Sequence, residues 1–235
     1  MTIRQNKLGH GAALLMLAVV LNGCGATLKT IDLTPSQTFQ GFAGGGGAHG
    51  FCFSADDPNM NTFSAGPGQL MVGFDDWFRP GAQPFPCDVF RSFVFRAGVK
   101  FDVSKFNSIV AASLLFDTAA SVSRDNGETV GQSPAFSFAN LLGLAHSSLG
   151  SDNALTDDDE ASLNQTSGSI NVGVSFQVRD LLNGSHANNG FVIGGPMAVP
   201  TKDNHPEDNK AQVSWYQNFR LRIVYNPAQN PNAPQ

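Results

Sequence analysis

An acidic stretch in this chain holds the side chains best suited to binding a metal ion. Carboxylate oxygens are the ligands that Ca²⁺ prefers, and several acids crowd the segment from Ser151 to Gln165. The spacing lacks the glycine at the sixth position of an EF-hand loop, so a solvated acidic surface loop is the competing interpretation. Structural calcium is therefore a candidate cofactor, and the sequence indicates no other. The candidate ligands are Asp152, Asp157, Asp159 and Glu160.

No residue pattern in the sequence indicates catalysis. A nucleophilic serine in a Gly-x-Ser-x-Gly elbow is absent, and His49, His146, His186 and His205 lack the His-Glu-x-x-His spacing that presents two imidazoles on one helical face. We therefore expect a protein that is not an enzyme.

Aromatic side chains suggest a candidate sugar-binding site. Trp77 and Arg79 lie in a polar stretch, Gly73 to Pro80, while Trp215 and Tyr216 precede the last expected strand. Exposed aromatic rings would stack on pyranose faces, and polar side chains such as that of Arg79 would bond to hydroxyl groups. Packing in the protein interior is the alternative for both tryptophans, and it weighs more for Trp215.

The first 23 residues form a basic and then apolar leader. Arg4 and Lys7 precede an apolar run of ten residues, Ala12 to Leu21, and a run of that length is too short to span a membrane, which takes about 20 residues. Gly23 and Cys24 then follow. Such a leader is typical of an export signal that is removed from the mature protein.

The end of this leader resembles a bacterial lipoprotein signal peptide. The resemblance lies in Leu21-Asn22-Gly23-Cys24, where Asn22 departs from the small or apolar residue usual at that place. It implies that Cys24 becomes an acylated N-terminus and that lipid attaches the protein to the membrane. Gly25, where an inner-membrane retention signal would have Asp, is similar to lipoproteins sent to the outer membrane.

Cys52 and Cys87 remain as a pair once Cys24 is assigned to lipid. In an oxidising compartment we expect a disulfide between them. It would stabilise the fold by up to about 4 kcal/mol in the chain-entropy model. A metal site or a redox pair is the alternative, although no Cys-x-x-Cys spacing supports it.

The charge balance excludes one class of partner. Removing residues 1–23 takes away Arg4 and Lys7 and no acid, so the formal charge changes from −5 to −7. Nucleic-acid binding needs clustered Lys and Arg, so we expect no nucleic-acid partner. The partners left are the membrane, through the lipid, and a surface polysaccharide or an envelope protein.

Period-two patterns place the expected strands. Apolar residues alternate with other residues from Phe93 to Val103 and from Ile170 to Val178, and continuous apolar runs occupy Ile109–Phe116 and Phe191–Ile193. Asp125-Asn126-Gly127 indicates a hairpin, since Asn and Gly tolerate a type I′ turn. The last expected strand is Phe219 to Tyr225, and a short turn capped by Gly184 is expected before it. No long helical period interrupts these strands.

The expected organisation has four parts. Residues 1–23 are the signal peptide, residues 24–50 a lipidated Gly-rich tether, residues 51–226 a β-sandwich domain that begins with a loop-rich, disulfide-stapled extension, and residues 227–235 a disordered Pro/Asn tail.

Residues 89 to 226 resemble the DNRLRE-type domain and related jelly-roll carbohydrate-binding modules. The resemblance rests on the segments 101–103, 109–116, 178–184, 188–193 and 220–225, of which 178–193 is similar to the stretch "dwlnG…NnGf". It implies an all-β, jelly-roll-like sandwich that binds, displays or scaffolds. The acidic insertion from Ser151 to Gln165 departs from the pattern. We expect a lipid-anchored envelope protein with structural, adhesive or scaffolding contacts, and the alternatives are a carbohydrate-binding module or an accessory subunit of a surface complex.

Overall fold

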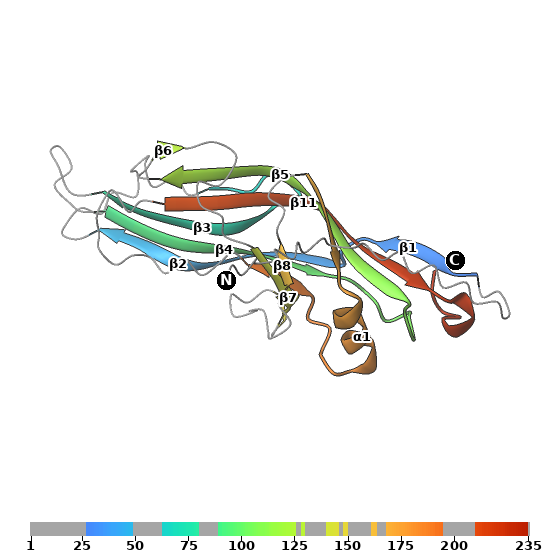
Figure 1. The fold of residues 1–235 in the computed structure, drawn as a ribbon. Helices are drawn as coiled ribbons and strands as arrows, with labels where there is room; N and C mark the ends of the chain where they lie inside the picture. Colours follow the sequence, from blue (N-terminus) through green and yellow to red (C-terminus); the bar gives the residue numbers. More distant parts are fainter. Residues whose placement is uncertain are drawn as a thin grey trace, which may run out of the picture.

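The computed structural model describes residues 27–48, 63–79, 89–125, 128–129, 140–145, 148–149, 161–163, 168–194 and 210–234. These residues form one curled antiparallel sheet of 11 strands, with one α-helix beside it (Figure 1). The all-β prediction is confirmed, and the sheet curls into a half-barrel with a sandwich-like arrangement.

The strands and helices follow the chain in a mixed order. The elements are β1 (Lys29–Leu33), β2 (Gln37–Ala48), β3 (Leu70–Arg79), β4 (Val89–Lys100), β5 (Ala111–Asp125), β6 (Glu128–Thr129), β7 (Asn140–Leu144), β8 (Ala161–Leu163), β9 (Ser169–Gly173), α1 (Ser175–Asn183), β10 (Phe191–Gly194), β11 (Lys210–Tyr225) and the 3₁₀ helix η3 (Pro227–Gln229).

The sheet divides into two layers along its length. Strand β11 pairs with β3 through residues 210–216 and with β1 through residues 221–225. In the same way, β4 pairs with β3 through residues 89–95 and with β10 through residues 96–99. Strand β3 therefore joins the two halves at one end. At the other end the layers β1-β11-β5-β9 and β2-β4-β10-β7-β8 are separate and enclose the main core.

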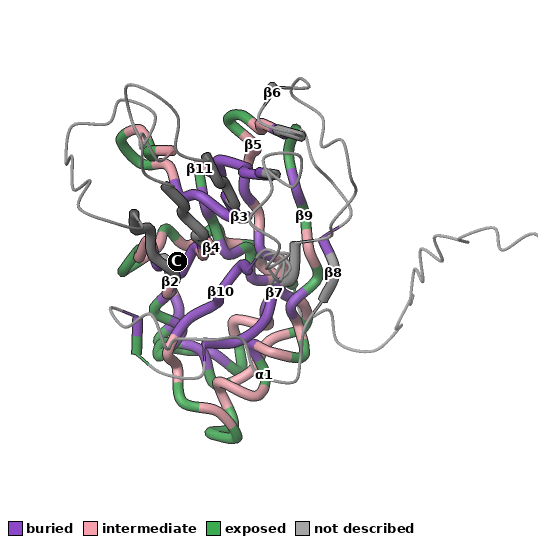
Figure 2. The backbone as a smooth tube through the Cα atoms, turned by 90° about the vertical axis from the view of Figure 1, so that its left-hand side faces the viewer, coloured by how far each residue is buried: buried purple, intermediate pink, exposed green. Residues whose placement is uncertain are grey.

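Apolar side chains from both layers fill the space between them. Period-two alternation brings every second residue of a strand to this inner face, and the buried segments of Figure 2 follow these strands. Aromatic pairs such as Phe116 and Tyr216, with ring centroids 5.0 Å apart, interlock across it. Fully buried members include Val72, Ala97, Val99, Phe101, Leu114, Phe116, Leu142, Val178, Phe191, Ile193, Tyr216, Leu221, Ile223 and Tyr225.

Most of the expected strands are confirmed. The segments around Phe93–Val103, Ile109–Phe116, Phe191–Ile193 and Phe219–Tyr225 contribute β4, β5, β10 and β11. The predicted hairpin is confirmed as well, because Asp125 pairs with Glu128 across a two-residue connection. A two-residue connection is the length for which Asn-Gly is favoured.

The expected tether of residues 24–50 is wrong for residues 29–48, which form two strands of the sheet. Strand β1 pairs with β11, and β2 pairs with β4 along its whole length, with Gly44–Gly47 opposite Phe93–Phe90. The backbone ladder with an aromatic-rich neighbour offsets the entropy cost of the glycines. The loop-rich expectation is also wrong for Leu70–Arg79, which forms the central strand β3.

The expected long strand from Ile170 to Arg179 is wrong in its second half. Strand β9 ends at Gly173, and α1 begins at Ser175. The same letters also carry a helical stripe, because Val174, Val178, Leu181 and Leu182 recur at spacings of four, three and one, and they pack against the core. The predicted glycine cap is confirmed, since Gly184 follows the helix with φ of 80°.

The expected disordered tail is wrong for residues 227–234, which pack against the sandwich. Asn226 caps η3 through a bond from Ala228 N to its Oδ1 at 3.0 Å. Asn230 is fully buried, and the Tyr225 hydroxyl donates to the carbonyl of Pro234 at 2.6 Å. Tertiary hydrogen bonds therefore order a segment whose composition alone is typical of a tail.

Candidate functional site

Trp215, one of the residues predicted to bind sugar, is a packing residue. It lies within β11 rather than ahead of the last strand, and it is 8% exposed. Its indole Nε1 donates to the carbonyl of Ser64 at 2.9 Å, and Phe63 packs edge-on with ring centroids 5.6 Å apart. Together with Met71, Phe95 and Val213 it forms a second apolar cluster, on the face of the sheet opposite the main core. This packing contradicts its role as a sugar platform.

Tyr216 is also wrong as a candidate ligand-binding residue. Its side chain is fully buried in the main core. Neighbouring residues of a strand face opposite sides, so Trp215 and Tyr216 cannot share one surface.

Trp77 and Arg79 lie in β3 and not in a loop. Their backbones pair with Arg91 and Val89 of β4. The side chains of both residues lie outside the part of the chain that the structure describes. Their backbones end the central strand, far along the sheet from the β1 end.

The remaining sequence candidates fall outside the described residues. These are the acylation candidate Cys24, the expected disulfide pair Cys52 and Cys87, and the calcium candidates Asp152, Asp157, Asp159 and Glu160. Across the described ranges, no three His, Cys, Asp or Glu side chains are grouped to hold a metal ion. The calcium and disulfide predictions stay predictions.

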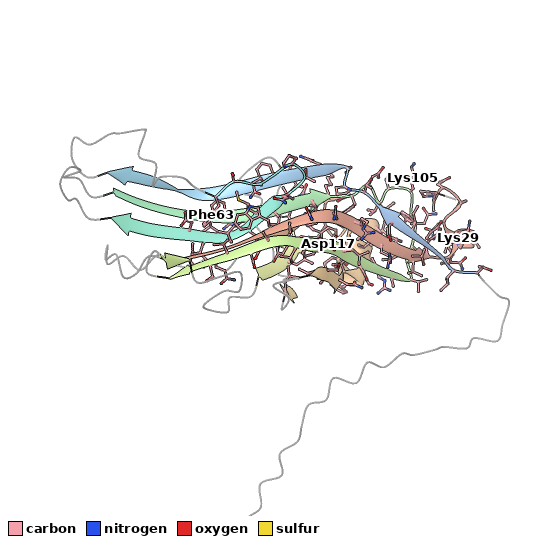
Figure 3. All side chains as sticks on the ribbon, turned by 90° about the horizontal axis from the view of Figure 1, so that it is seen from above. Lys29, Phe63, Lys105 and Asp117 are labelled. Atoms are coloured by element: carbon pink, nitrogen blue, oxygen red, sulfur yellow. The ribbon has the colours of Figure 1, made fainter. Side chains whose placement is uncertain are left out.

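The structure instead forms a depression at the end of the sandwich where β1 begins. Its volume is about 250 Å³, and it opens to solvent between the β4–β5 connection and α1. Lys29 and Lys105 mark the same end of the molecule in Figure 3. The lining residues are Asn107, Ser108, Ile109, Arg179, Leu182 and Asn183.

The C-terminal segment holds one wall of the depression in place. Asn230 Oδ1 accepts bonds from the backbone N–H groups of Asn107 at 2.7 Å and Ser108 at 3.1 Å. The Asn107 side chain donates to the carbonyl of Gln229 at 3.0 Å. The buried Asn230 therefore does for this loop what a neighbouring strand would do.

Helix α1 forms the other wall. Val178 is fully buried in the core and fixes the rotation of the helix, so Arg179 and Leu182 face the depression. The Arg179 guanidinium donates to the carbonyl of Val110 at 2.8 Å. Ser175 Oγ accepts from Ala112 N at 2.8 Å and ties the first turn to β5.

The depression offers one cation, amide and hydroxyl groups, and two aliphatic side chains. This mixture suits the binding of an anionic or hydroxyl-rich group beside an apolar one. None of its six lining side chains is a carboxylate, a thiol or an imidazole. The arrangement can bind and orient, and its chemistry supplies no general base.

Charged side chains decorate the outer face of the β1-β11-β5-β9 layer. Asp32 accepts two bonds from the Arg222 guanidinium, at 2.8 and 2.9 Å, and these bonds hold the pKa of the carboxyl group below its usual value. Further along, Asp117 accepts bonds from Ser169 Oγ at 2.7 Å and Asn218 Nδ2 at 3.0 Å, which likewise lower its pKa. These groups pin neighbouring strands to each other.

Sequence reasoning missed every residue that lines the depression. Asn107, Ser108 and Ile109 lie ahead of a strand, and Arg179, Leu182 and Asn183 belong to the helix that was expected to be a strand and a turn. The helical stripe of Val174, Val178, Leu181 and Leu182 was the signal that could have placed Arg179 and Leu182 on one helix.

No protein-family model matches the chain, and no curated protein matches it. Within the described ranges, no helix has the length and apolar character needed to cross a membrane.

Proposed function

We propose that this protein is a non-enzymatic, lipid-anchored protein of the cell envelope, whose β-sandwich makes structural, adhesive or scaffolding contacts. The observation that carries the proposal is the lipoprotein-like motif Leu21–Cys24, which lies only four residues ahead of Lys29, the first residue of β1. An acyl group on Cys24 would therefore be attached almost directly to the folded sheet.

The short connection limits how far the sandwich can lie from the bilayer. Four extended residues reach at most about 14 Å. Strand β1 pairs with β11 over all five of its residues, and the Asp32–Arg222 pair joins the two strands on their outer face. Three acyl chains would hold the protein permanently, because each buried methylene contributes about 0.8 kcal/mol. Outer-membrane sorting, suggested by Gly25, belongs to this proposal.

The opposite end of the sheet would then project away from the membrane. Strand β11 has 16 residues, which span about 50 Å at about 3.3 Å per residue. Strand β3 ends at Arg79, and β4 begins at Val89, at that far end. Trp77 and Arg79 are thus placed, by their backbone, where contacts with a surface polymer or an envelope protein would form.

Intact mass of the membrane-extracted protein tests the proposal. The expected mass is that of residues 24–235 plus acyl groups, with two hydrogens gained on reduction when Cys52 and Cys87 are bridged. The matched control is Cys24→Ser, which should keep residues 1–23 and carry no acyl group. A wild-type chain without acyl groups would overturn the proposal.

The carbohydrate-binding alternative rests on Trp77 and Arg79, since Trp215 and Tyr216 are buried. A glycan panel read out by melting temperature separates the two functions. A sugar that stabilises the wild type and not Trp77→Ala would favour a carbohydrate-binding module. The accessory-subunit alternative would show itself as a stoichiometric partner in co-purification with the acylated chain.

A further inference from the structure

The large apolar side chains that the described part of the molecule leaves exposed gather at one end. Leu28 is 50% exposed, Val110 is 45% exposed and Phe176 is 63% exposed. Single exposed apolar residues are common on protein surfaces, whereas a group of them at one place marks a contact surface. Their shared location therefore asks for an occupant.

Backbone pairing fixes how these three residues lie relative to one another. Leu28 precedes Lys29, which pairs with Tyr225 at the end of β11. Val110 N donates to the carbonyl of Val224, one residue earlier in the same strand. The three positions thus lie along the edge formed by the start of β1, the end of β11 and the start of β5.

Phe176 continues this row through α1. Val174 N donates to the carbonyl of Ala112, and Ser175 bonds to the same residue, so the first turn of the helix lies beside the start of β5. Arg179 is one turn after Phe176 and bonds to the carbonyl of Val110. In Figure 1 the start of β1, the start of β5 and α1 all lie toward the same end of the sandwich.

We infer that this end, defined by Leu28, Val110 and Phe176, docks onto the surface of a lipid bilayer. The inference rests on the proposed acylation of Cys24. Leu28 is the fourth residue after Cys24, so acyl chains on Cys24 would hold this edge within about 14 Å of the bilayer. A surface kept that close to lipid, with apolar side chains exposed on it, buries them in the interface.

Charge at this end is compatible with lipid head groups. Lys29, Lys105 and Arg179 lie here together with Asp102 and Asp180. Asp102 is engaged by Ser104, which donates through its hydroxyl and its backbone N–H. Arg179 lines the depression beside Val110, where its guanidinium faces a polar space that a phosphate can enter. The apolar residues supply the insertion, and Arg179 supplies a contact to the phosphate.

The test places a polarity-sensitive fluorophore at single introduced cysteines in the acylated full-length chain. The variants are Val110→Cys, Phe176→Cys and the control Ala65→Cys, an exposed position near Trp215, about ten residues back along β11 and so about 30 Å away. The unsubstituted chain, labelled without reduction, sets the background. Each is reconstituted into phosphatidylcholine vesicles, with or without bromine on the acyl carbons near the head group.

Labels at positions 110 and 176 should shift to the blue and be quenched by brominated lipid about twofold or more relative to position 65. Phe176→Ser should weaken quenching at position 110 while leaving the melting temperature of the chain unchanged. Equal quenching at all three positions would overturn the inference.

Other outcomes also have a fixed meaning. If mass spectrometry shows acylation and positions 110 and 176 are not quenched, docking is overturned while the proposed function stands. A chain without acyl groups overturns the proposed function itself. A blue shift that depends on protein concentration and needs no lipid would show that a second copy of the chain covers this edge, which also overturns docking onto lipid.

Discussion

The side-chain amide of Gln40 pairs with both backbone groups of Met71. Gln40 Oε1 accepts from Met71 N at 2.5 Å, and Nε2 donates to the carbonyl of Met71 at 3.0 Å. Gln40 pairs with Ala97 of β4, just beyond Phe95, where the pairing of β3 with β4 stops. The amide thus acts as a neighbouring strand at the point where one sheet becomes two layers.

Replacing Gln40 with Ala should destabilise the protein by about 2–4 kcal/mol, because partly buried backbone groups of Met71 and Arg96 lose their partners. Urea unfolding followed by circular dichroism measures the loss. Gln217→Ala, at a half-exposed position of β11, is the control and should change stability by less than about 0.5 kcal/mol. Equal stability of the two variants would contradict the role given to the amide.

Gly73→Ala should destabilise strongly, by about 3 kcal/mol or more, because two effects combine. Gly73 has φ of 135°, and a Cβ added there would lie 1.8 Å from the carbonyl oxygen of Gln212. Gly173→Ala is the matched control, since a Cβ at that position meets nothing within 4 Å. Thermal unfolding of both variants decides the matter, and a Gly73→Ala protein that melts with the control would refute the close approach of β3 and β11.

Asn230→Ala should cost about 2–3 kcal/mol, because the N–H groups of Asn107 and Ser108 lose their acceptor. Hydrogen exchange should also become faster at these two amides, which identifies the lost bonds directly. Asn232→Ala, an exposed residue of the same segment, should leave both measurements unchanged. Unchanged exchange in Asn230→Ala would mean that the tail does not hold the depression together.

Stability should fall in acid through Asp32. Its pKa is held below the ordinary value of 3.8 by the bonds from Arg222. A carboxyl group whose folded pKa is lowered contributes stability above its unfolded pKa, and that contribution is lost as the pH falls below about 4 toward the folded pKa. Asp32→Asn should therefore show a smaller acid loss in urea midpoints measured from pH 6 to about pH 2. Thr30→Ala, on the same strand, should follow the wild type, and an unchanged acid dependence in Asp32→Asn would contradict the assignment.

Trp215→Phe should destabilise by about 1–2 kcal/mol, since the carbonyl of Ser64 loses its donor and the cluster with Phe63 loses contacts. Any glycan binding should be unaffected, because the indole lies under the segment that begins at Phe63. Melting temperatures with and without glycan test both statements. A variant that melts like the wild type and loses a glycan would restore Trp215 as a ligand-binding residue.

Local patterns were sufficient for much of the sheet. Strict alternation from Phe93 to Val103 and the turn residues after Asp125 specify β4 and the β5–β6 hairpin through period-two burial and φ preferences. These properties act between residues close in the chain, so they can be read without knowing what lies across the sheet. The all-β class followed from them.

Long-range contacts decided the rest. Gly41–Ala48 forms a strand because β4 offers it a ladder, and Val174–Leu182 winds into a helix because its apolar stripe meets the core between the layers. The depression joins Asn107 to Asn230, 123 positions away. Such sites depend on which distant segments meet. The sequence alone determined the chemistry of each segment and the local strands, whereas the tertiary structure decided which segments share a surface, because packing across the sheet outweighs weak local preference.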